Sequence, residues 1–205
     1  MVDFGSTPVT GIHSLAIERL RDYYGLERRP VKVIESFQWL GEVEEDLQEA
    51  MGADVQGIIL PFTAFGHRQE NWKAFRTPWG QEVLVPGEFN TTLDDNGDVL
   101  MYPQGDLSVG PSARMPASGY FFDAIIRQEP IDESRLDPAD NVEEFSVMGK
   151  ETQEYFQRAA EEAAGKGKGT IINIGGMHLG NIAMVPGNAL KHPKGIRDVA
   201  EWYMS

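Results

Sequence analysis

The stretch SFQWLGEVEEDLQEAMGADVQGIILPF, residues 36–62, decides the fold class. Apolar residues recur at helical spacing from Leu40 to Met51, and Gly52 follows them, so residues 36–52 predict an amphipathic helix. ADVQGIILPF then forms an apolar run bounded by proline, which predicts a buried strand. A helix followed closely by an apolar strand is typical of a parallel sheet, so the stretch predicts an α/β protein.

The acidic residues of this predicted helix lie mostly on the face opposite its apolar residues. Paired carboxylates sometimes mark acid–base chemistry or a metal site, but such a run on a helix is usually a solvated surface. We therefore expect that role for Glu42, Glu44, Glu45, Asp46 and Glu49.

The same alternation of helix and strand recurs elsewhere in the chain. Residues 14–25 and 150–165 predict helices that end at glycine, residues 170–176 predict a second buried strand, and residues 192–205 begin another helix. The rhythm is interrupted over about residues 77–127, where alternating patterns and an Asp-Asn-Gly turn at 95–97 predict an inserted antiparallel meander.

Composition narrows the function classes. The 205 residues suffice for one domain, or two, and the 18 Lys+Arg against 32 Asp+Glu give a net charge of −14. This charge disfavours nucleic acid and anionic membrane as partners. No apolar run approaches the roughly 18 residues that a membrane helix needs, and no export signal is evident, so a cytoplasmic location is expected. The absence of cysteine excludes disulfides and thiolate chemistry within the chain.

The most suggestive local motif is NIGGMHLGN, residues 173–181, a strand that runs into a glycine-rich turn. It lacks the central glycine of a dinucleotide fingerprint, because Met177 stands there. Each histidine taken alone is better interpreted as structural. His13 and His178 rank above the others because each follows a predicted strand within a glycine-rich loop, and such loops share one face of a parallel α/β sheet.

Several long phrases resemble one known superfamily. They are VDFGSTPVTGIHSLAIERLRDYYGL, VEEDLQEAMGADVQGIILPFTAFG, TPWGQEVLVPGEFNTT and ARMPASGYFFDAI. The chain is similar over nearly its whole length to the uroporphyrinogen decarboxylase superfamily, which also contains the corrinoid-dependent methyltransferases. The branch that it resembles most is methyltransferase-like and carries a strand meander after the second barrel strand.

The resemblance implies a (β/α)8 barrel with its site at the carboxyl ends of the strands. Residues 2–6, 55–60 and 170–175 would be the first three strands, and TPVTGIH the first loop into the barrel mouth. A whole barrel needs roughly 250 residues. The resemblance therefore implies that residues 1–205 are the N-terminal part of such a barrel, with about three βα units and the meander inserted at about 77–127.

The resemblance does not carry over the decarboxylase mechanism. The decarboxylases have an R-Q-A-G-R-Y motif in the first loop and an aspartate at the end of the second strand, whereas this chain has GSTPVTGIH and, at the second position, Leu60 and Pro61. Methyl transfer fits better, and it implies a tetrapyrrole, a methylated small molecule or a corrinoid protein as partner. A corrinoid and a zinc ion would be cofactors of the full-length parent, with none held by this chain alone.

The alternatives at this point are a decarboxylase and a non-catalytic binding module. The chain alone is expected to be inactive, because only the first loops of the site would be present, and it is expected to form a homo-oligomer that covers an open sheet edge. The residues expected to line the pocket are Asp3, Ser6, Thr10, His13, Phe62, Phe65, Asn173 and His178.

Overall fold

A computed structural model describes residues 1–174 and 185–204. The described chain falls into two compact units. Unit 1 comprises residues 1–63, 69–87 and 148–174, and unit 2 comprises residues 64–68, 88–147 and 185–204. Each unit has its own sheet and its own buried core.

The larger sheet of unit 1 has the strand order β1-β3-β2-β6-β5. Strands β2 and β6 are parallel, and the other neighbours are antiparallel. Helices α1 and α2 contribute Ile17 and Leu47 to a core cluster with Val31 and Val43. The bounds are β1 Ile12–His13, α1 Ser14–Tyr23, β2 Val31–Glu35, β3 Leu40–Gly41, α2 Glu45–Met51, β5 Lys73–Arg76 and β6 Glu82–Val85.

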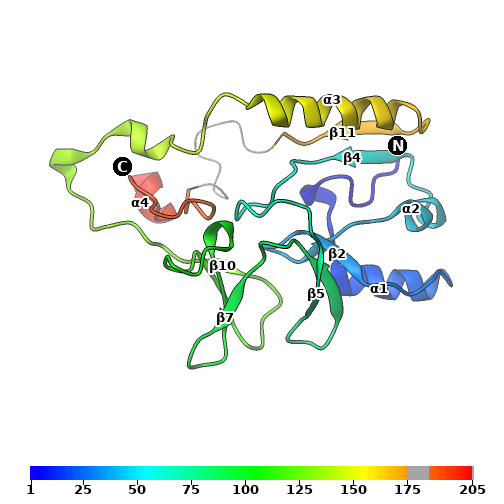
Figure 1. Ribbon diagram of the computed structural model, residues 1–205, viewed down its shortest axis with the longest axis horizontal. Coiled ribbons are helices and arrows are strands. Elements are labelled where there is room, and N and C mark those ends of the chain that lie inside the picture. The colour runs from blue at the N-terminus through cyan, green and yellow to red at the C-terminus, as the bar shows by residue number, and fades with distance from the viewer. Residues whose placement is uncertain (175–184, 205) are drawn as a thin grey trace. The chain divides into compact units, whose positions relative to one another are not determined.

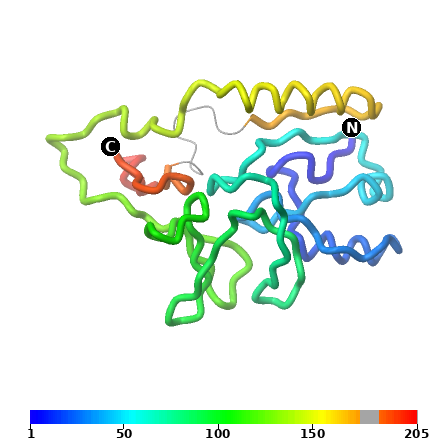
Figure 2. The backbone as a smooth tube through the Cα atoms, viewed as in Figure 1, coloured from blue at the N-terminus to red at the C-terminus, as the bar shows by residue number. Residues whose placement is uncertain are grey.

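A second, two-stranded sheet of unit 1 is parallel. Strand β4 (Val55–Ile58) pairs with β11 (Gly169–Ile172), and α3 (Lys150–Ala164) lies along the pair (Figure 1). Phe156 and Ala163 of α3 are buried against Ile58. The N-terminal segment runs beside β4, where the Asp54 amide donates to the Val2 carbonyl at 3.0 Å (Figure 2).

The molecule is therefore a mixed α/β protein with several sheets, and no closed barrel occurs among the described residues. Two of the three expected barrel strands overlap β4 and β11, but residues 2–6 form no strand, which corrects that prediction. Gly5 has φ +75° and its amide donates to the Thr10 carbonyl, so the chain turns back where an extended strand was expected.

Antiparallel strands lie in the region of the expected meander, but they belong to two sheets. The β5–β6 hairpin begins at Lys73 and joins β2 in unit 1. The four-stranded sheet of unit 2 has the order β10-β9-β8-β7, with β7 Thr91–Leu93, β8 Val99–Met101, β9 Ala113–Met115 and β10 Asp123–Ala124. The predicted turn joins β7 to β8, and Gly97 adopts φ +81° there.

The helix expected over residues 36–52 is wrong in its first half. Leu40 lies in β3, and α2 begins only at Glu45. Trp39 is fully buried at φ +56°, and its carbonyl accepts the Ser14 amide, so the chain turns into a strand before it can start a helix. The predicted end at Gly52 is confirmed, because this glycine takes the left-handed conformation.

The last elements of unit 2 are short. Helix α4 covers Val199–Met204, so the helix expected from residue 192 begins later, after Pro193 and the turn at Gly195, whose φ is +70°. No helix within the described ranges has the length and apolar character to cross a membrane. The 3-10 helices lie at Pro8–Thr10, Pro103–Gly105, Glu133–Arg135 and Pro138–Asn141.

Candidate functional site

The carboxyl ends of β2 and β4 are joined by one side chain, Gln69. Its Nε2 donates to the Ile34 carbonyl at 3.3 Å and to the Leu60 carbonyl at 3.1 Å. Its main-chain amide donates to the Pro61 carbonyl at 2.9 Å. These bonds bring the ends of strands from two different sheets of unit 1 together.

The carboxyl end of β11 meets the same place. The Asn173 amide donates to the Ile58 carbonyl at 2.7 Å, and the Ser6 main chain lies directly against Gly57. In open α/β sheets, ligands bind at the carboxyl ends of parallel strands. The candidate site is therefore this set of strand ends, which we call the rim: Ser6, Ile34, Leu60, Gln69 and Asn173.

The first loop next to the rim is held by Asp3. One oxygen of its carboxylate accepts the Ser6 amide at 3.2 Å, and the other accepts the Thr10 hydroxyl at 3.0 Å. Three of the predicted pocket residues thus lie together. These two bonds hold the loop in its turn.

His13 is the last residue of this loop and lies at the start of α1. Its Nδ1 accepts the Leu15 amide at 3.1 Å, which places the ring proton on Nε2. The ring lies 5.4 Å from that of Trp79, whose indole packs edge-on against Trp39. The structure therefore places His13 as a helix cap within an aromatic cluster.

A residue that the sequence did not single out connects this cluster to α1. Gln81 is buried, and its Oε1 accepts the Ser14 hydroxyl at 3.1 Å and the Trp79 indole N–H at 3.2 Å. Its Nε2 donates to the Ser14 carbonyl at 3.0 Å. Ser14 and Gln81 are 67 positions apart, so no local pattern predicts the contact.

The two predicted apolar mouth residues have different positions. Phe62, which follows β4, is 40% exposed. Phe65 is fully buried in unit 2, where its ring lies 5.9 Å from that of His67 and 6.3 Å from that of Phe122. It is a core residue, which corrects the expectation for it. His178 lies outside the described residues.

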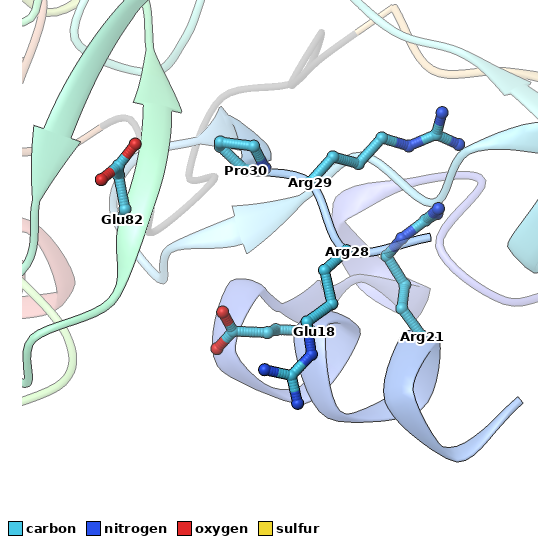
Figure 3. Close-up of a pocket in the computed structure, with 6 residues that line it drawn as sticks. All are labelled: Glu18, Arg21, Arg28, Arg29, Pro30 and Glu82. Atoms are coloured by element: carbon cyan, nitrogen blue, oxygen red, sulfur yellow. The ribbon is translucent and has the colours of Figure 1, made fainter. Parts of the chain in front are cut away.

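A separate groove of about 200 Å³ lies beside α1 (Figure 3). Arg21 from α1 makes a two-pronged contact with Asp46, at 2.9 and 2.8 Å, and Arg29 contacts Asp46 and Glu44. The bond from Arg21 holds the pKa of Asp46 at about 2. The lining residues are Glu18, Arg21, Arg28, Arg29, Pro30 and Glu82.

These ion pairs decide what the groove can bind. Arg28 is paired in the same way, with Asp22, so all three arginines of the groove already have carboxylate partners. The groove is therefore a poor site for an anionic ligand. Glu44 and Asp46 are also not merely a solvated helix surface, because they neutralise the buried Arg21, which corrects that expectation.

No cluster of three or more metal-ligating His, Asp or Glu side chains occurs in residues 1–174 and 185–204, and the chain has no cysteine. Zinc sites usually have at least three protein ligands, so the described donors do not fit one. Comparison with protein-family models, curated proteins and solved structures finds no match for the chain.

Proposed function

We propose that the chain belongs to the methyltransferase-like branch of the uroporphyrinogen decarboxylase superfamily and binds a corrinoid or tetrapyrrole at the rim. One observation supports this most strongly. The carboxyl ends of β2, β4 and β11 meet through the bonds of Gln69 and Asn173. This is where a parallel α/β scaffold presents a ligand site, and it includes Ser6 and Leu60, which lie in phrases that carry the resemblance.

We propose a partial (β/α)8-type arrangement for the parallel part of unit 1. It is supported by the order in which three segments lie side by side: the N-terminal segment lies beside β4, and β4 pairs with β11 in parallel. A helix precedes each of these two strands, α2 before β4 and α3 before β11. Strands β5–β10 would then be the insertion between the second and third units.

The residues next to the rim suit a large, partly apolar ligand. The first loop contains small residues whose backbone a macrocycle can approach closely, and Asp3 holds it in one conformation. Phe62 offers an exposed aromatic face next to the end of β4. In this proposal the chain binds and orients the ligand. A corrinoid would supply the methyl group, and no step is assigned to zinc because the described donors do not fit it.

Decarboxylation of uroporphyrinogen is the less favoured activity. Its carboxylates need cationic partners, but residues 5–13 contain no arginine, and the groove arginines already pair with Asp22, Glu44 and Asp46.

We also propose that the chain is a homo-oligomer in the cytoplasm. The oligomeric state is supported by the exposed apolar side chains of β11 and α4, such as Ile172 and Tyr203.

The proposal is tested by absorbance titration of the purified chain with hydroxocobalamin and, separately, with coproporphyrin. We expect saturable binding of one of them, weakened at least about fivefold by Phe62→Ala, because an exposed aromatic contact is lost. Phe121→Ala is the matched control, since Phe121 is a comparably exposed phenylalanine of unit 2.

Two results would contradict the proposal. One is the absence of saturable binding to either compound, and the other is equal weakening by both substitutions. Saturable binding that leads to no methyl transfer, when methylcobalamin, zinc and a thiol acceptor are supplied, would instead favour the binding module. Carbon dioxide release from uroporphyrinogen would favour the decarboxylase.

A further inference from the structure

Glu35 ends strand β2 and adjoins the rim. It follows Ile34, whose carbonyl accepts from Gln69. One oxygen of its carboxylate accepts the Phe37 amide and the other accepts the Gln38 amide, each at 2.8 Å. The turn after β2 thus fixes the carboxylate at the strand end.

Glu35 is partly buried and differs from Asp98 and Glu144, two carboxylates whose side chains are largely withdrawn from water. Asp98 pairs with Arg114 at 3.1 Å, and Glu144 pairs with Arg197 at 2.7 Å. None of the ion pairs in the described chain includes Glu35, whose hydrogen bonds are to main-chain amides. It is a partly buried carboxylate without a counter-ion among the described residues.

The surroundings of Glu35 oppose its negative charge. Burial raises the pKa of Glu35, although the amides of Gln38 and Phe37 act in the opposite direction. The next residue, Ser36, is fully buried, and its hydroxyl has no hydrogen-bond partner within the described residues. Polar groups withdrawn from water in this way are costly unless something compensates them.

We propose that the rim binds an organic ammonium group, with Glu35 as its counter-ion. The chain neutralises Asp98 and Glu144 with its own arginines, whereas at Glu35 the ligand supplies the cation. A divalent metal is a worse fit, because it needs several oxygen ligands and no suitable cluster occurs within the described ranges. The inference rests on the proposed function in one respect, the use of the rim as the ligand site.

The test follows the amide NMR signals of Phe37 and Gln38, which report on Glu35 directly. The intact chain is titrated with choline and, at equal ionic strength, with its neutral carbon isostere dimethylbutanol. We expect choline to shift both signals saturably and the neutral isostere to leave them in place. Glu35→Gln should weaken choline binding at least about tenfold, since it removes the charge and keeps the shape.

Glu49→Gln is the matched control, because Glu49 is an exposed carboxylate of α2. It should bind choline like the unaltered chain. Equal shifts with choline and dimethylbutanol, or none with choline, would overturn the inference. If Glu35→Gln fails to fold, the comparison of the two probes on the unaltered chain still decides. No corrinoid or tetrapyrrole is present in this test, so its outcome is independent of the titrations proposed above.

Discussion

The main-chain oxygen of Ser6 lies where a side chain on Gly57 would begin, because a Cβ atom at position 57 would be 1.6 Å from that oxygen. Only glycine allows the N-terminal segment to approach β4 so closely. Gly57→Ala should therefore destabilise the chain by about 3 kcal/mol, measured by urea unfolding, and should loosen the loop that Asp3 holds.

Gly169→Ala is the control for this prediction. Gly169 lies on the neighbouring strand β11, and a Cβ there would have its nearest contacts at 3.5 Å, which is ordinary packing. We expect a change below about 1 kcal/mol. Equal stability losses in the two variants would contradict the close approach of Ser6.

Asp46→Asn should destabilise unit 1 near neutral pH, because Arg21 is buried and would lose its two-pronged partner. The Asp46 side chain is 36% exposed, so solvent screens the pair and the expected loss is only about 1–2 kcal/mol.

The pH dependence of this loss has a definite sign. The folded pKa of Asp46 is about 2, below its ordinary 3.8, so the stabilisation is complete above pH 3.8 and disappears as the pH falls through 2. Chemical unfolding over this range should show the two proteins converging in acid. Asp22→Asn, at the exposed pair with Arg28, should show no measurable loss at any of these pH values.

Gln81→Met should destabilise the chain by about 2–3 kcal/mol, because it keeps the volume but removes every bond to Ser14 and the Trp79 indole. The tryptophan emission should shift as well, since Trp79 loses this acceptor. Gln157→Met on the exposed face of α3 serves as the comparison and should leave both signals unchanged. An unaltered emission spectrum in Gln81→Met would count against the network.

The stability of the Glu35→Gln variant, relative to the unaltered chain, should increase as the pH rises. The pKa of Glu35 is raised above its ordinary 4.5, so the folded chain holds this proton more tightly than the unfolded chain. The ionised carboxylate therefore costs stability above pH 4.5, and this cost vanishes below it. In acid the variant should be less stable by about 1 kcal/mol, because one amide loses its acceptor.

Near neutral pH that deficit should shrink or reverse, since glutamine is never charged. Thermal unfolding of both proteins at matched ionic strength measures the difference. A deficit that grows with pH would mean that the carboxylate of Glu35 is stabilised in its charged form.

Light scattering at micromolar concentration should find a dimer. The Ile172 side chain is 48% exposed on β11, and among the described strands β11 pairs only with β4, which leaves an apolar edge for a second copy. Ile172→Lys should shift the equilibrium toward the monomer because it places a charge on that edge. Thr170→Lys, also on β11, should shift the equilibrium in the same direction if the edge itself forms the interface. A monomeric unaltered chain would refute the prediction.

Local signals in the sequence predicted the parts of the fold that depend on local physics. Gly52 ends α2 and Gly97 turns β7 into β8, since both need a left-handed backbone that the residue type itself permits. Strand β4 and helix α3 could be predicted from the local sequence for the same reason.

The sequence failed where distant residues decide the conformation. Trp39 takes a left-handed conformation that its residue type disfavours, and its carbonyl bonds to Ser14 in a different element. Phe65 lies only a few residues after Phe62, yet the core of unit 2 buries it. At the site, the sequence suggested Ser6 and Asn173, but nothing local marks Gln69 as the residue that connects two sheets.

The bonds of Gln69 also affect the entropic cost of ligand binding. A single amide nitrogen bonds the carbonyls of Ile34 and Leu60, so neither strand end can shift without breaking one of these bonds. The gap between these two ends is consequently fixed before any ligand arrives. Little ordering of that part of the backbone remains to be done on binding, so its entropic cost is small. Selectivity there should follow the shape and charge of the ligand, with little adjustment of the backbone.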